Sequence, residues 1–83
     1  FQAVALGFPD GEEYAPSVVA KGEFDMAAHM VAVATKYGIP VVERPELCEA
    51  LHEVEVDQSI PQQLFAAAAA LLVEIGILHR REE

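Results

Sequence analysis

The spacing of apolar residues changes near residue 24, and this change restricts the chain to folds that combine strands with helices. Two short runs rich in small and β-branched residues, 2–8 and 17–22, come first. The Pro-Asp-Gly sequence at 9–11 between them is typical of a turn, because proline fixes φ and glycine accepts a positive φ. Further on, apolar side chains recur at helical spacing: Met26, Met30, Val33, Ala34 and Tyr37. The pattern predicts two strands and then a helix over 24–37.

The second half of the chain also alternates between strand and helix signals. Residues 39–43, Ile-Pro-Val-Val-Glu, predict a third strand with its proline near the start, where a missing N–H is tolerated. A second helix is expected over 45–54, since proline suits the first helical position. Residues 55–57 fit either a short fourth strand or a loop. The serine and glutamine of 59–62 match a capping box for a closing helix. We expect the apolar face of that helix to contain Leu64, Phe65, Ala68, Leu72, Ile75 and Leu78.

The order of these elements predicts an α/β domain. The first two strands are joined by a loop alone, so they can pair antiparallel as a hairpin. The strand–helix–strand order over 17–43 requires a crossover, which makes those two strands parallel in one sheet. A chain of 83 residues has room for one hydrophobic core. We therefore expect residues 1–83 to form a single domain with a small mixed sheet of about four strands, flanked by three to four helices.

The chain is acidic, with five Lys and Arg residues against fourteen Asp and Glu and a formal net charge of −9. This balance argues against binding nucleic acid through its phosphates and against docking on an anionic membrane, because both need a basic surface. The longest apolar stretch, 64–75, is shorter than the roughly 20 residues that cross a bilayer, so we expect no membrane insertion. The single cysteine cannot form an internal disulfide, which favours a reducing compartment. Three glutamates on one stripe of the second predicted helix indicate a solvated face: Glu46, Glu49 and Glu53.

No group of residues has the spacing of a catalytic or metal site. Cys48 and His52 lie one helical turn apart, but a zinc site needs about four ligands and no further ligand motif is present. The candidate nucleophiles, among them Ser17 and Ser59, lack a surrounding Gly-x-Ser-x-Gly or glycine-rich phosphate-binding sequence. We therefore expect no catalytic residue, no metal and no cofactor. An alternative is a small-molecule binder with a crevice at the ends of the parallel strands.

Several segments together resemble a known family. They are Ala3-Val4-Ala5-Leu6, Pro16-x-Val18-Val19-Ala20-Lys21-Gly22, Ile39-Pro40-Val41-Val42-Glu43-x-Pro45-x-Leu47, Leu51, and Ile60-Pro61 with the closing helix. In this order and spacing, nearly the whole chain resembles the cytoplasmic C-terminal domain of the FlhB/YscU family, the export-apparatus proteins of flagellar and virulence type III secretion. The resemblance implies a four-stranded sheet flanked by helices and a part in switching secretion from early to late substrates. It also implies an Asn-Pro-Thr-His loop that cleaves itself between Asn and Pro, just before the first strand.

The chain departs from the family pattern at this cleavage site. Phe1 falls where the histidine of the motif is expected, and Gln2 falls where an aromatic residue is usual. Because a phenyl ring cannot accept a proton, we expect no autocleavage by this chain as it stands. Val31 also occupies a position that is often basic in the family. We expect either a standalone soluble homologue or a domain of a longer chain, and the alternative function is a self-cleaving export-switch protein whose Asn-Pro-Thr-His motif lies upstream of residue 1.

The resemblance and the missing motif together favour a non-enzymatic interaction domain. The expected partners are export-apparatus components or secreted substrates, in the cytoplasm or at the inner face of the bacterial cytoplasmic membrane. Lys21 is one of only five basic residues and ends an apolar strand, whose edge another strand could pair with. The predicted partner-binding residues are Pro16, Val18, Val19, Lys21 and Gly22, together with the degenerate cleavage region Phe1 and Gln2.

Overall fold

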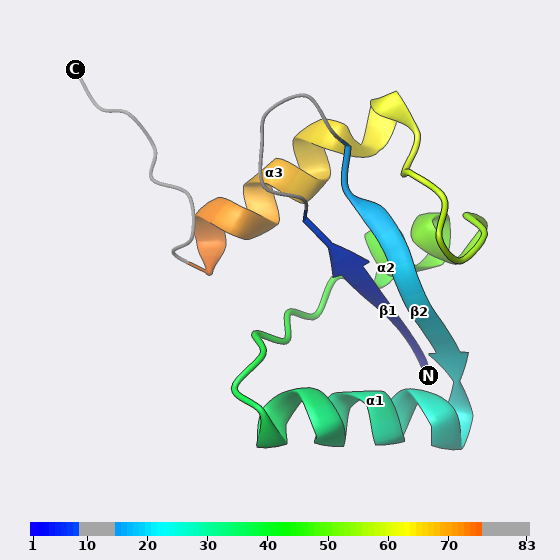
Figure 1. The fold of residues 1–83 in the computed structure, drawn as a ribbon, viewed down its shortest axis with the longest axis vertical. Helices are drawn as coiled ribbons and strands as arrows, with labels where there is room; N and C mark the ends of the chain where they lie inside the picture. Colours follow the sequence, from blue (N-terminus) through cyan, green and yellow to red (C-terminus); the bar gives the residue numbers. More distant parts are fainter. Residues whose placement is uncertain (9–14, 76–83) are drawn as a thin grey trace.

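The computed structural model describes residues 1–8 and 15–75, and Figure 1 shows them as a hairpin of two strands surrounded by helices. The turn predicted at 9–11 lies outside the described residues. The same holds for the chain beyond residue 75, including Leu78 of the predicted closing helix.

The hairpin consists of β1 (Gln2–Gly7) and β2 (Ser17–Glu23), which pair antiparallel as predicted. Its register shifts between Ala5 and Leu6. Ala5 faces Ala20, whereas Leu6 faces Val18, so the residue between them on β2 has no partner on β1. This extra residue is a β-bulge, which increases the local twist of the strand that carries it.

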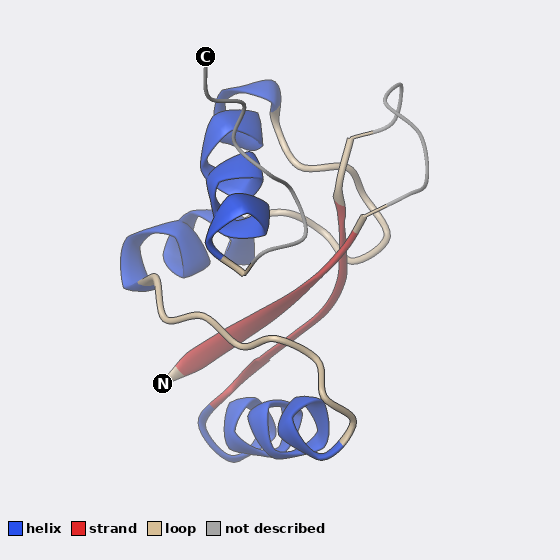
Figure 2. Cartoon of the chain, turned by 90° about the vertical axis from the view of Figure 1, so that its left-hand side faces the viewer, coloured by secondary structure: helices blue, strands red, loops and turns tan. Residues whose placement is uncertain are grey.

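Three α-helices complete the described fold, at the lower end of the predicted number. α1 (Phe24–Lys36) follows β2 directly and lies across one end of the hairpin (Figure 1). α2 (Pro45–His52) packs against β1, and the single-turn 3-10 helix η1 (Gln62–Leu64) leads into α3 (Phe65–Glu74). Figure 2 shows α1 at the lower end of the strands and α3 near their upper end. Within the described ranges, no helix is both long and apolar enough to cross a membrane.

The main core joins β2, α2, α3 and the loop that precedes η1. Its buried members are Val18, Leu51, Ile60 and Ala68. Apolar side chains that are partly buried pack around them: Val4, Leu6, Leu47, Val54 and Leu64. α1 contributes a separate buried residue, Ala27. Because burial of apolar surface is the main favourable term in folding, the core residues fix α2 and α3 against the hairpin.

The apolar face of α1 agrees with the predicted face only in part. Met26 and Tyr37 are exposed, with 58% and 70% of their surface accessible. Met30 and Ala34 of the predicted face are partly buried, as predicted, and Ala27, which was not predicted, is the buried position. The small Ala27 side chain lets the helix backbone approach the hairpin closely, so it takes the inner position in place of Met26.

The predicted third strand at 39–43 is wrong, because these residues form an irregular segment between α1 and α2. Pro40 has no N–H to donate, and Ile39 N–H donates back to Ala34 O of α1 at 2.8 Å. Without a third strand the predicted parallel pair is also missing. The described sheet therefore has two strands, fewer than the four that the sequence and the family resemblance predicted.

Residues 55–57 form a loop, which decides between the two alternatives left open by the sequence. Just after them, Ser59 forms an isolated antiparallel bridge with Ser17 of β2. Because Ser59 takes part in this bridge, it does not cap a helix. Neither η1 nor α3 has a side-chain hydrogen bond at its N-cap. The predicted capping box is therefore wrong, and Leu64 N–H donates to Pro61 O at 2.9 Å instead.

Candidate functional site

The chain itself occupies the start of the outer edge of β2. Val18 N–H donates to Gln58 O at 3.1 Å, and Asp57 N–H donates to Val18 O at 2.7 Å. Ile60 N–H donates to Pro16 O at 2.9 Å, and the Val18 side chain is fully buried. Two predicted partner-binding residues, Pro16 and Val18, thus hold the loop before η1, and their binding to a partner stays a prediction.

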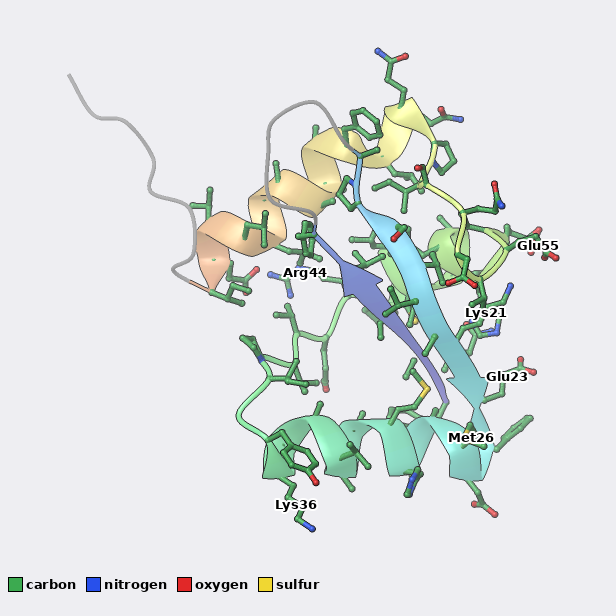
Figure 3. All side chains as sticks on the ribbon, viewed as in Figure 1. Lys21, Glu23, Met26, Lys36, Arg44 and Glu55 are labelled. Atoms are coloured by element: carbon green, nitrogen blue, oxygen red, sulfur yellow. The ribbon has the colours of Figure 1, made fainter. Side chains whose placement is uncertain are left out.

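The Lys21 ammonium lies at the C-terminal end of α2, next to Glu55 (Figure 3). Its Nζ donates to His52 O at 3.0 Å and to Val54 O at 2.8 Å, and lies 3.9 Å from Glu55 Oε2. The last carbonyl groups of a helix have no partner within the helix and carry partial negative charge, so Lys21 caps α2. Since the Glu55 side chain is 85% exposed, the ion pair itself adds little. Lys21 therefore joins β2 to α2, and its contact with a partner stays a prediction.

Val19 and Gly22, also predicted to bind a partner, have different surroundings. Val19 is the extra residue of the bulge and about half of its surface is exposed. Gly22 lies beneath α1, where an added Cβ would come within 2.7 Å of Met26 Cγ and 2.9 Å of Met30 Sδ. Val19 is thus available for contact, whereas Gly22 serves the close approach of α1 to the hairpin.

Gln2 begins β1 and Phe1 directly precedes it, next to the end of β2. Phe1 O accepts a hydrogen bond from Phe24 N–H at 2.8 Å, and Gln2 Nε2 donates to Glu23 Oε2 at 3.4 Å. The Phe1 and Phe24 side chains are exposed by 70% and 74%. Phe24 also has a φ of 51°, a left-handed value that bulky residues rarely adopt. Two exposed aromatic residues therefore mark this end of the hairpin.

A cleft that was not predicted from the sequence lies along the outer edge of β1. It has a volume of about 800 Å³ and is bounded by β1, α1, the segment 39–44, α2 and the C-terminal end of α3. Figure 1 shows the segment 39–44 running from the end of α1 toward α2. Most side chains that line the cleft are apolar, among them Phe1, Phe8, Ile39, Val41, Leu72 and Ile75. The apolar residues interpreted as a third strand thus line a cleft, and the proline among them was the one sequence signal against a strand.

The backbone of β1 alternates between groups that face β2 and groups that face the cleft. Val18 directs both its N–H and its C=O away from β1, toward Gln58 and Asp57. Leu6, which lies opposite Val18, is therefore in a non-hydrogen-bonded pair, and its own N–H and C=O point toward the cleft. Val4, two residues earlier, has the same orientation, and its N–H is directed at the Cys48 thiol of α2.

Cys48 is a free cysteine that lines the cleft from α2. Burial raises the pKa of its thiol, and the hydrogen bond from the Val4 backbone N–H offsets part of this rise. The thiol is consequently protonated and weakly nucleophilic at neutral pH.

The charged groups at the cleft are mainly acidic. Glu43 and Glu49 line it and are exposed. Arg44, the basic residue among the described side chains of the lining, pairs with Glu74 of α3. Glu46 of α2 and Glu53, the C-cap residue of this helix, are exposed as predicted, so the acidic surface continues along α2.

Cys48 and His52 are the two possible metal ligands recognised in the sequence. His52 Nδ1 is a buried nitrogen without a hydrogen-bond partner. Among residues 1–8 and 15–75, no three or more Cys, His, Asp and Glu side chains come together as a metal site would require.

Residues 2–75 match the model of the FlhB HrpN YscU SpaS Family. The chain is similar to the flagellar biosynthetic protein FlhB of Aquifex aeolicus, with 39% identity over 74 residues that make up 88% of this chain and 21% of that protein. It is also similar to the uncharacterized protein YlqH of Bacillus subtilis, with 33% identity over 70 residues, or 84% of this chain and 75% of YlqH. The chain thus spans about a fifth of the FlhB protein and three quarters of YlqH.

The fold is similar to that of a solved family member. The cytoplasmic domain of FlhB from Shewanella putrefaciens superposes with a TM-score of 0.84 at 38% identity, over 98% of this chain and 66% of that one. The resemblance predicted from the short sequence segments is confirmed by both the sequence and the fold. The chain belongs to the FlhB HrpN YscU SpaS family and corresponds to the cytoplasmic C-terminal domain of its members.

Proposed function

We propose that this domain is a non-enzymatic docking module of bacterial flagellar or type III protein export, which takes part in the switch of substrate specificity. Its partners are export-apparatus components or secreted substrates, and it acts in the cytoplasm, at the inner face of the cytoplasmic membrane. The observation that carries the proposal is the open, largely apolar cleft beside β1 in a domain of this family. Apolar surface left open in a small domain is typical of sites for protein partners.

A photo-crosslinking experiment in bacteria tests the docking function. The photoreactive amino acid benzoylphenylalanine replaces Ile39 in the cleft or Val19 on β2, two apolar positions that are about half exposed. Glu53, the exposed C-cap residue of α2, is the control position. We expect Ile39 or Val19 to crosslink to an export-apparatus protein or a secreted substrate, and Glu53 not to. If neither position gives crosslinks beyond those of the control, the docking function is refuted.

We infer further that the chain as it stands performs no backbone cleavage. The Phe1 side chain offers no group that could accept or donate a proton at the first peptide bonds of β1. The mass of the purified chain should therefore stay constant during prolonged incubation at neutral and mildly alkaline pH. Appearance of a discrete shorter product without added protease would instead support a self-cleaving protein.

A further inference from the structure

We propose that a groove between α2 and α3 receives an amphipathic helix of a partner protein, with basic residues beside the apolar stripe of that helix. The inference rests on the docking function proposed above and adds to it a second surface with its ligand. The groove has a volume of about 590 Å³. Leu47 and Leu71 line both this groove and the cleft beside β1. Ala50, Leu64 and Ala67 line the groove and not the cleft.

The first argument is the separation of the two helices. Leu51 of α2 and Ala68 of α3 belong to the same buried core, yet the backbones of α2 and α3 approach each other at few points. The groove lies between them and is lined by Leu47 and Leu64, which pack against that core. Because these lining residues belong to the folded core, the groove is formed before a partner binds.

The second argument is that the walls of the groove suit a helix. They are themselves helices, whose backbone N–H and C=O groups bond within each helix, so an extended segment finds no free strand edge here. A helix binds such a groove through its apolar side chains. Ala50 and Ala67 are small and only partly buried, so a third helix can approach both walls closely. The ten residues of α3 span about 15 Å, which matches about three turns of a bound helix.

The third argument is charge. Glu46 lines the groove with an exposed carboxylate, and Arg44, the basic residue among the described side chains of the lining, is already paired with Glu74. The whole chain carries a formal charge of −9, which opposes the docking of a second copy on this face. A helix with lysine or arginine beside its apolar stripe would be attracted, and charge complementarity of this kind mainly sets the rate and specificity of binding.

A peptide experiment tests the inference. The probe is a synthetic peptide of about fourteen residues, or four helical turns, with leucine at every third or fourth position and lysine or alanine elsewhere. The control peptide has glutamate in place of lysine. We expect the lysine peptide to shift the NMR signals of the Ala50 and Ala67 amides but not that of Ala28, an exposed residue of α1, and to lose affinity as salt is raised. The glutamate peptide should shift none of them.

A pair of variants on α3 tests whether the peptide occupies the groove. Ala67 lines the groove, whereas Ala66 is exposed and does not line it. Leucine is a good helix former, so circular dichroism should show the fold retained in Ala67→Leu and Ala66→Leu. Ala67→Leu should weaken binding of the lysine peptide at least about tenfold, because the larger side chain fills the groove. Equal binding by the two variants would refute the inference.

A second pair of variants separates the charge at the groove from the general acidity of the chain. Glu46 and Asp25 are both exposed and both lie in the first turn of a helix, but only Glu46 lines the groove. Glu46→Lys should weaken binding of the lysine peptide at least about fivefold more than Asp25→Lys, because its added charge lies at the site. Equal effects of the two variants would contradict the inference, as would peptide binding that leaves the Ala50 and Ala67 signals unchanged.

The crosslinking and peptide experiments can fail separately. Glu53 lines neither the cleft nor the groove, so it remains a suitable control position for crosslinking. Specific crosslinks from Ile39 or Val19, without peptide-induced shifts at Ala50 and Ala67, would retain the docking function and reject the groove as a second surface. Absence of specific crosslinks from both Ile39 and Val19 would reject the docking function itself, and the groove would then lose the role inferred for it.

Discussion

Replacing Lys21 with methionine tests the idea that this lysine acts mainly as a cap on α2. Methionine keeps most of the apolar length of the side chain but removes the ammonium that donates to His52 O and Val54 O. Hydrogen bonds to a charged group contribute about 1.5–3 kcal/mol each, less where the freed carbonyl groups can bind water instead. With the Lys21 side chain 24% exposed, we expect Lys21→Met to lower the free energy of unfolding by about 2 kcal/mol in total.

Thermal and urea unfolding followed by circular dichroism measure this effect. For a domain of this size, the expected loss corresponds to a fall in Tm of roughly 8–16 °C. Lys36→Met is the matched control, since Lys36 is exposed and its Nζ lies 5.7 Å from the centre of the Tyr37 ring. It should change stability by less than about 0.5 kcal/mol. Equal effects of the two substitutions would show that the capping bonds of Lys21 do not stabilise the fold.

Three further substitutions probe backbone strain, packing and ionisation. Phe24→Asn should raise the free energy of unfolding by about 1 kcal/mol, because asparagine tolerates the φ of 51° and the Phe24 side chain, which is 74% exposed, contributes little packing. A loss of stability in this variant would contradict the prediction. Gly22→Ala should lower the free energy of unfolding by about 1–2 kcal/mol in urea, because the new methyl group would press on Met26 and Met30. An unchanged midpoint of urea unfolding would mean that both methionines move aside freely. The raised pKa of Cys48 predicts that stability falls as pH rises through the ordinary range of thiol ionisation, because the unfolded thiol loses its proton first. Cys48→Ala should abolish this alkaline decline, and an equally steep decline in that variant would assign it to other groups.

The local elements of the fold follow from residue types that act over short distances. The hairpin, α1 and α2 were predicted from apolar runs and from Pro45, whose fixed φ suits the first turn of a helix. The inner face of α1 was predicted only in part, at Met30 and Ala34, because apolar residues surround much of this helix. Its orientation depends on close approach at Gly22 and Ala27, which spacing alone does not reveal.

The candidate site was harder to predict because it depends on pairing between distant segments. The sequence 39–43 has the composition of a strand, but a strand also needs a partner, and β1 leaves a cleft at this position. Lys21 was singled out for its rarity in an acidic chain, yet its bonds to the end of α2, more than thirty residues away, became visible only in three dimensions.

Hydrogen exchange of the free protein, resolved by residue, tests the open edge of β1 most directly. Ala5 faces β2 within the ladder, whereas the neighbouring Leu6 N–H points toward the cleft. We expect the Leu6 amide to exchange at least about tenfold faster than that of Ala5, because an amide without a hydrogen-bond partner is not protected. Equal, strong protection of both amides would mean that a further strand already pairs with β1, and that the cleft is closed in solution.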